Sequence, residues 1–112
     1  MQSYDFDYMF RAEEVSVHVD YERGGYKNTE LTLNARFVFG DRKLSLGNLV
    51  LHLAPRELEE ERILKKIREA VKRNISIHLR YTLDYENRKR MDKAMRQLLG
   101  NEWHPSSRKR HR

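Results

Sequence analysis

Residues 63–83, ILKKIREAVKRNISIHLRYTL, contain two hydrophobic periodicities, and the change from one to the other decides the fold class. Up to Val71, apolar side chains recur at spacings of three and four, which is typical of a helix with one buried face. From Ile75 to Leu83, apolar and polar residues alternate, which is typical of a half-buried strand. Asn74 separates the two patterns, so we expect the helix to end there.

The residues that flank this stretch predict the other elements of the second half. Pro55 suits a first helical turn, and glutamates crowd the start of the helix while lysines and arginines crowd its end, as the helix dipole favours. Asp84 is placed to cap a second helix, which ends at Gly100-Asn101. The apolar stripe of this second helix is formed by Met91, Ala94, Met95, Leu98 and Leu99.

Alternation of apolar and polar residues also predicts strands throughout the first half of the chain. The alternating segments are residues 4–10, 15–21, 31–39 and 43–53. The phase changes across residues 11–14, which indicates a bulge or a short turn, and again at Gly47-Asn48, which indicates a bulge. Gly24-Gly25 and Gly40-Asp41 provide hairpin turns, because glycine tolerates the positive φ that such turns require.

The predicted order of elements is therefore β-β-β-α-β-α, an α+β fold, in which residues 4–21 count as one strand that a short turn at residues 11–14 would break in two. Hairpins make the first three strands antiparallel, and the first helix lets the fourth strand join the sheet by a crossover. Because each strand has one apolar face, we expect an antiparallel-rich sheet of four or five strands with two helices on one face. We expect residues 1–103 to form a single domain, followed by a flexible basic tail at residues 104–112.

The composition argues against several classes of site. The 112 residues include no cysteine, which removes disulfides, thiolate nucleophiles and Cys-containing metal sites. The five histidines follow no metal-ligand spacing, and His18-x-Asp20 places only two ligands on one strand face. We therefore expect no enzymatic activity, no metal and no cofactor. No signal peptide or membrane-spanning run is visible, which predicts a cytoplasmic protein, or a nuclear one if a eukaryotic cell reads the basic tail as an import signal.

Basic residues are concentrated in the second half of the chain. The formal net charge is +6, yet residues 1–55 carry six basic and eight acidic side chains, whereas residues 56–112 carry 17 basic and nine acidic. The candidate nucleic-acid contacts lie on the second helix and in the tail: Arg88, Lys89, Arg90, Lys93, Arg96, Arg108, Lys109, Arg110 and Arg112. A charge run on a helix is usually its solvated face, but a basic arm beside a basic helix neutralises several phosphates together. The sequence therefore favours a small non-enzymatic protein that binds nucleic acid through phosphate contacts.

An alternative function uses the polar face of the sheet. If the helices cover one face, the other face presents polar side chains, and the candidate interface residues are His18, Asn34, Arg36, His78 and Arg80. Such a face would bind a partner protein, as an adaptor or inhibitor does, or a second copy of the chain. Salt separates the two functions, because phosphate neutralisation weakens steeply with ionic strength and an interface with an apolar centre does not.

Overall fold

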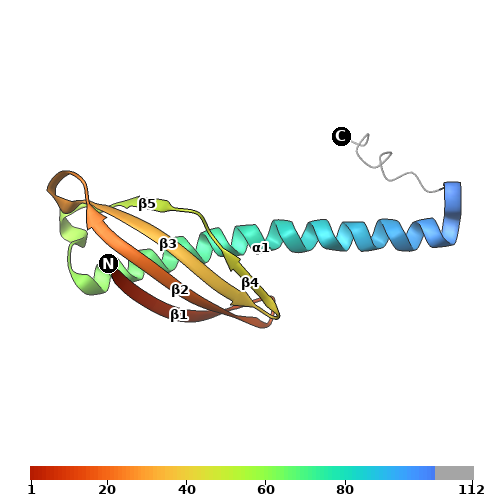
Figure 1. Ribbon diagram of the computed structural model, residues 1–112, viewed down its shortest axis with the longest axis horizontal. Coiled ribbons are helices and arrows are strands. Elements are labelled where there is room, and N and C mark those ends of the chain that lie inside the picture. The colour runs from red at the N-terminus through yellow and green to blue at the C-terminus, as the bar shows by residue number, and fades with distance from the viewer. Residues whose placement is uncertain (103–112) are drawn as a thin grey trace. The chain divides into compact units, whose positions relative to one another are not determined.

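The computed structural model describes residues 1–102, which form one antiparallel sheet, one long helix and three short 3₁₀ turns (Figure 1). The strands are β1 (Gln2–Phe10), β2 (Glu13–Gly24), β3 (Glu30–Phe39), β4 (Arg42–Ser45) and β5 (Leu49–His52). The helix is α1 (Glu60–Leu99), and the turns are η1 (Tyr26–Asn28), η2 (Pro55–Glu57) and η3 (Gly100–Glu102). The chain divides into two units, Met1–Ser76 and Ile77–Arg112.

The sheet follows the chain order β1-β2-β3-β4, and every neighbouring pair is antiparallel. β5 also pairs with β3, so β4 and β5 share that strand: β4 pairs with residues 36–39 and β5 with residues 30–33. The predicted strand at residues 43–53 is thus two short strands, interrupted where the sequence indicated a bulge. The α+β class and the antiparallel five-stranded sheet are confirmed.

The turn between β1 and β2 consists of only two residues, Arg11 and Ala12. Their φ angles are 49° and 64°, and positive φ at both central residues is what a type I′ hairpin turn requires. The phase change that the sequence places across residues 11–14 is therefore a short turn. Neither residue is a glycine, so the hairpin holds two side chains in the left-handed region that L-residues disfavour.

The core of the first unit lies between one face of the sheet and one stripe of α1. The inner face buries Phe6, Tyr8, Val15, Val17, Val19, Tyr21, Leu31, Leu33, Ala35, Phe37 and Phe39. The first part of α1 lies along this face (Figure 1). Its buried side chains recur at a spacing of four: Ile63, Ile67, Val71 and Ile75. No polar or charged residue is buried within residues 1–102, so the packing between the two layers is almost purely apolar.

The outer strand β1 is joined to α1 by contacts at the margin of this core. The hydroxyl of Tyr8 lies 3.1 Å from Ser76 Oγ, and burial raises the pKa of this phenol, an effect that the bond to Ser76 partly offsets. Arg68 and Lys72 lie over the rings of Phe6 and Tyr8, with the charged groups 5.5 and 5.4 Å from the ring centroids. The helix thus contacts the edge of the sheet through its long basic side chains as well as through its apolar stripe.

A charged network fastens β5 to the start of α1. The backbone N–H of Ala54 donates to Glu57 Oε1 at 2.8 Å, and Lys66 Nζ donates to Glu57 Oε1 at 3.1 Å and to the carbonyl oxygen of His52 at 2.7 Å. The Ala54 N–H, followed by Lys66, lowers the pKa of Glu57. The stabilisation by ionised Glu57 is therefore present at neutral pH and is lost as the pH falls through that lowered pKa.

The prediction of two helices, with a strand at residues 75–83 between them, is wrong. α1 is one helix from Glu60 to Leu99, so the element order ends in a single helix and no crossover strand joins the sheet. Asn74 does not end the helix. Its side-chain amide donates to the carbonyl oxygen of Ala70, one turn earlier in α1, at 2.8 Å. Asp84 lies in the helix interior rather than at a cap.

The apolar residues of the segment 75–83 fit both the period of two of a strand and the spacing of four of a helix, so alternation alone predicts the wrong element. Ile75 and Leu79 lie two alternation steps apart, but they are also four residues apart and continue the buried stripe of the preceding helix. Residues 56–99 contain neither glycine nor proline, so nothing interrupts the helix that begins at Glu60. Extending a helix that is already nucleated adds a hydrogen bond per residue, and this outweighs a local preference for alternation.

Ile75→Ala and Ile77→Ala test the helix against the strand, because a strand buries both side chains and the helix buries only the first. Ile75 is fully buried, whereas Ile77 is 43% exposed. We expect Ile75→Ala to lower the free energy of unfolding by about 2–5 kcal/mol and Ile77→Ala to lower it by less than about 1 kcal/mol. Urea melts of dilute protein measure both, and equal losses would contradict the helical assignment.

Ala12→Gly tests the strain in the β1–β2 turn. A left-handed conformation costs an L-residue about 1–2 kcal/mol, and the larger unfolded-state entropy of glycine offsets about 0.4–1 kcal/mol of the gain. We expect Ala12→Gly to raise the free energy of unfolding by about 0.5–1 kcal/mol. The control Ala70→Gly, inside α1, should lower it by about 1 kcal/mol. A loss of stability in both variants would show that the turn is not strained.

Candidate functional site

The face of the sheet turned away from the core carries rows of side chains that are fixed by the strand register. One row crosses four strands and consists of Asp5, His18, Arg36 and Ser45. A second row consists of Asp7, Ser16, Val38 and Lys43, and a third of Ser3, Asp20 and Asn34. Side chains directly opposite each other on adjacent antiparallel strands lie close enough to interact, so each row is a chain of possible contacts.

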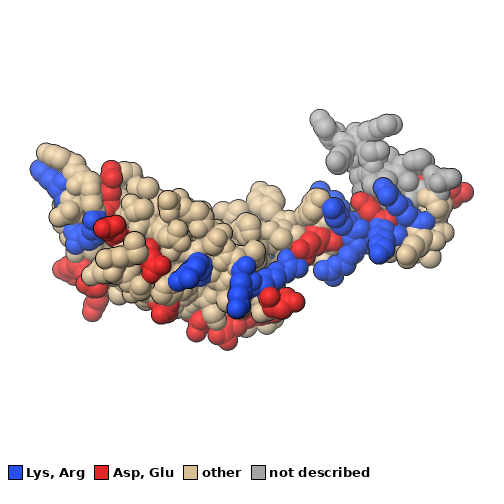
Figure 2. Space-filling model, viewed as in Figure 1, with Lys and Arg blue, Asp and Glu red and all other residues tan. Residues whose placement is uncertain are grey.

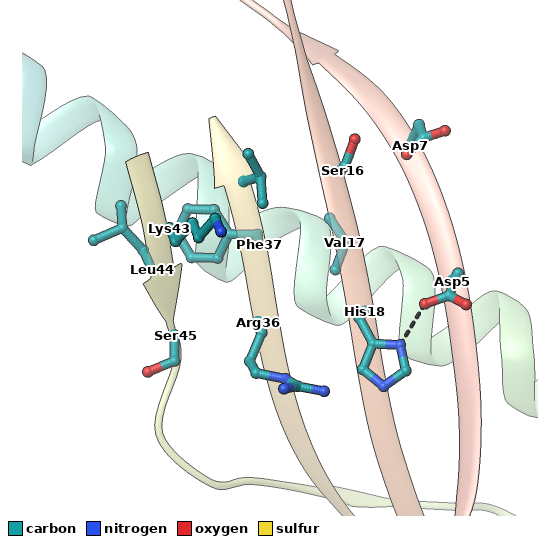
Figure 3. A pocket seen from close by; sticks show the side chains of 11 residues that line it. Asp5, Asp7, Ser16, Val17, His18, Arg36, Phe37, Lys43, Leu44 and Ser45 are labelled. Atoms are coloured by element: carbon teal, nitrogen blue, oxygen red, sulfur yellow. Dashed lines mark hydrogen bonds and ion pairs between the residues drawn. The ribbon is translucent and has the colours of Figure 1, made fainter. Parts of the chain in front are cut away.

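His18 lies at the centre of this face, between two carboxylates. Its Nδ1 lies 2.5 Å from Asp5 Oδ1 on β1, and its Nε2 lies 3.0 Å from Asp20 Oδ1, two residues along β2 (Figure 3 shows the pair with Asp5). Asp20 also accepts a hydrogen bond from Ser3 Oγ at 2.8 Å and lies 3.9 Å from Arg36 Nη2. The strands β1, β2 and β3 are thus joined by one polar network.

Within this network the pKa values of His18 and Asp20 are shifted. The hydrogen bond to Asp5 raises the pKa of His18, burial opposes this rise to a smaller extent, and the hydrogen bond to Asp20 adds a smaller rise. The hydrogen bond from Ser3, the bond from His18 and the charge of Arg36 lower the pKa of Asp20. The arrangement therefore favours a protonated imidazole that donates to two ionised carboxylates.

A shallow cavity of about 590 Å³ opens on the same face, across β1 to β4. Figure 3 shows Asp5 and Asp7 on the β1 side and Arg36 and Lys43 on the side of β3 and β4. The lining is therefore acidic at one end and basic at the other, with Val38, 39% exposed, in the same row as Lys43. Such a surface suits a partner that itself carries both signs of charge.

The charged side chains of this face are suited to contact with a polar partner. Both ring nitrogens of His18 are engaged by carboxylates, so neither is positioned to accept a proton from a substrate. Within residues 1–102, no group of three or more histidine, aspartate or glutamate side chains is arranged to hold a metal ion. The site is an electrostatic surface whose central histidine is held in one orientation.

The second unit offers a different surface, formed by the helical residues from Ile77 onward. The candidate nucleic-acid residues that the structure describes, Arg88, Lys89, Arg90, Lys93 and Arg96, are all exposed on α1. On the face that Figure 2 shows, basic side chains outnumber acidic ones along this part of the helix. Lys89 Nζ lies 4.9 Å from the ring centroid of Tyr85, and Arg90 lies 3.9 Å from Glu86.

The division into two units also divides the charge. Residues 1–76 carry 13 basic and 13 acidic side chains and are formally neutral. Residues 77–112 carry ten basic and four acidic side chains, so the whole net charge of +6 belongs to the second unit. This boundary is sharper than the one at residue 55 that the sequence patterns suggested, because residues 56–76 carry seven basic and five acidic side chains, and this excess cancels the acidic excess of residues 1–55.

The structure separates the residues that the sequence grouped as one interface. His18, Asn34 and Arg36 lie on the open face of the sheet, but His78 and Arg80 lie on α1, so their placement on a strand beside His18 is wrong. Asn34 Nδ2 donates to Asn48 Oδ1 at 3.2 Å. The four basic residues of the tail, Arg108, Lys109, Arg110 and Arg112, lie outside the described residues.

Sequence reasoning missed Asp5 and Ser3 as partners of the His18-x-Asp20 pair. A signal for them was present, because a two-residue turn at Arg11 and Ala12 pairs residues whose numbers add up to 23. That register places Asp5 opposite His18 and Ser3 opposite Asp20. The missing step was the choice between a bulge and a turn at residues 11–14, since a bulge leaves one continuous strand in which Asp5 and His18 do not pair.

Comparison with known protein families, with curated proteins and with solved structures found no match to this chain. None of the helices formed by residues 1–102 combines the length and the apolar character that crossing a bilayer requires.

Asp5→Asn tests the electrostatics of the sheet face. Because Asp5 is the main cause of the raised pKa of His18, we expect this variant to lower that pKa toward 6.5, whereas Asp7→Asn, one row away, should change it less. Histidine Cε1–H signals followed by NMR across pH measure the pKa directly. A His18 pKa at or below 6.5 in the unmodified protein, or equal effects of the two variants, would contradict the geometry.

The same shift makes a pH-dependent contribution to stability. A histidine whose pKa is raised on folding stabilises the folded state fully below the unfolded value of about 6.5, and this stabilisation is lost as the pH rises through the folded pKa. Urea melts of the Asp5→Asn variant should show a smaller decline over that interval than those of the unmodified protein.

Proposed function

We propose that this protein is a small non-enzymatic binding protein that contacts nucleic acid through the phosphate backbone. The contact surface is the exposed basic part of α1, from Arg88 to Arg96, together with the C-terminal arm at residues 104–112. The observation that carries this proposal is the segregation of charge: the first unit is formally neutral, and the second holds the entire net charge of +6. A charge confined to one part of a chain attracts a polyanion to that part.

The spacing of the helical residues supports this proposal. Lys89, Lys93 and Arg96 recur at intervals of four and three, so they point to one side of α1. Seven residues of helix rise about 10 Å, and duplex DNA presents one phosphate for about every 1.7 Å of its axis. Three cations over this length can therefore reach separate phosphates.

The composition of the arm adds to this surface. Residues 104–112 contain four arginine and lysine residues and no acidic residue, a composition that is typical of arms that bind nucleic acid. Phosphate contacts position a protein without reading bases, so binding by the helix and the arm should be similar for different base sequences.

Removing the helical cations should weaken binding and reduce its salt dependence. Each phosphate contact with B-DNA contributes about 0.9 to the slope of log affinity against log salt, so replacing Lys89, Lys93 and Arg96 by alanine should lower the slope by about 3. Deleting residues 106–112, which removes the four basic residues of the arm, should lower it by a similar amount. Fluorescence anisotropy of a labelled duplex at several salt concentrations measures both changes.

A matched control removes the same charge from the neutral first unit. Arg56, Lys65 and Arg73 are exposed there, and replacing all three by alanine also lowers the net charge by three. We expect this control to keep the slope of the unmodified protein. Equal effects of the two triple variants, or no binding by the unmodified protein at low salt, would reject the proposal.

The second candidate function is protein binding at the open sheet face. It is favoured by the cavity there, which is acidic at its β1 end and basic at its β3 and β4 end. A partner would be held by Asp5 and Asp7 on one side and by Arg36 and Lys43 on the other. This function predicts that the arm and the second part of α1 can be altered without loss of binding. Protein binding at the sheet face becomes the proposed function if the unmodified protein does not bind nucleic acid.

A further inference from the structure

The second unit carries an apolar stripe that is distinct from the buried one. It follows the alternating spacing of four and three that is typical of a coiled coil, and its members are Ile77, Tyr81, Asp84, Arg88, Met91, Met95 and Leu98. Tyr81 is 72% exposed, Met91 is 51% exposed and Leu98 is 78% exposed. Large exposed apolar side chains gathered on one side of a helix, here on both sides of Asp84 and Arg88, are unusual on a protein surface and mark an interface.

This stripe lies on a different side of α1 from the one that forms the core. The buried stripe advances in steps of four, from Ile63 to Ile75 and on to the fully buried Leu79. Ile77 precedes Leu79 by two residues, which corresponds to about 200° around a helix, so the two residues point to opposite sides. A helix of this length in water is stabilised mainly by packing of its apolar face, and the second stripe therefore calls for a second surface.

We propose that residues 77–95 of two chains pack against each other as an antiparallel helical pair. The choice of a second copy and of its direction comes from the two charged residues inside the stripe. In a parallel pair in register, Asp84 would face Asp84 of the partner subunit, and Arg88 would face Arg88 of the partner subunit, with repulsion at both levels. An antiparallel pair instead brings Asp84 opposite Arg88 of the partner subunit, and the symmetry of the pair provides this contact twice.

The same register matches the apolar residues. With Asp84 opposite Arg88 of the partner subunit, Tyr81 lies opposite the partner's Met91, and Ile77 lies opposite the partner's Met95. Every apolar residue in this span meets an apolar residue, and every charge meets its opposite. A shift by one heptad would place Arg88 against apolar side chains, so the polar pair fixes the register, which is the best-established role of such pairs.

The proposed pair leaves the basic surface of the helix available. Lys89, Lys93 and Arg96 lie on the side of α1 opposite to the stripe, so they remain at the outside of the pair. The inference does not depend on the proposed function, because association of two chains is measured with no nucleic acid present. If both proposals hold, each dimer presents two copies of the basic surface.

Charge reversal of the polar pair tests the proposal. In Asp84→Arg, arginine faces arginine at both symmetric contacts, and in Arg88→Asp, aspartate faces aspartate, so neither full-length variant should dimerise. An equimolar mixture of the two variants restores both opposite-charge contacts between the chains, although each chain still carries like charges at positions 84 and 88 of its own helix. We expect sedimentation velocity, from about 1 μM to about 1 mM protein, to give dimers of the unmodified protein and of the mixture only.

A matched pair of variants separates this effect from a general effect of charge. Glu86 and Arg90 form a similar pair four residues apart, with atoms 3.9 Å apart, but they lie outside the stripe. Glu86→Arg and Arg90→Glu should each dimerise as the unmodified protein does, and circular dichroism should show equal helicity in all four variants. A full-length protein that stays monomeric up to about 1 mM, or a mixture that stays monomeric while the unmodified protein dimerises, would overturn the antiparallel pair.

Discussion

The packing of one helical stripe on the inner face of the sheet is the constraint on which the rest of this structure depends. The stripe from Ile63 to Ile75 repeats every four residues, and each of its side chains is almost fully buried against a sheet face that is almost entirely apolar. Burying a side chain of this size contributes about 1.5–3 kcal/mol relative to exposure. Because one helix satisfies the inner face, no second helix is needed, and the outer face of the sheet stays open for the row that includes His18.

Charge follows the same division of the chain. Where the helix packs on the sheet, its basic excess is offset by the acidic excess of the strands and of the turn before the helix, and its charges take part in local contacts, such as the one between Lys66 and Glu57. Beyond Ser76 the basic residues outnumber the acidic ones, and most side chains are exposed. The first unit therefore provides a stable neutral fold, whereas we propose that the second provides the contacts with other molecules.

Much of the fold could be predicted from the sequence, because the strands have one buried face each and their turns contain recognisable residues. The prediction failed at residues 75–83, where alternation and a spacing of four coincide and only the continuity with the preceding helix distinguishes them. At the candidate site, His18-x-Asp20 was visible as a pair on one strand face. Its partner Asp5 was not, because only a turn at residues 11–14 pairs the two segments, whereas a bulge leaves them in one strand.

The central claim is that the charged second unit, and not the sheet, meets nucleic acid. The most direct measurement is an NMR titration of the isotope-labelled full chain with a short duplex, which reports each residue separately. The account predicts that amide signals from Arg88 to Arg96 and from the C-terminal arm shift together, while those of His18 and Arg36 on the sheet face do not. Shifts that cluster on the sheet face, or no shifts at low salt, would contradict it.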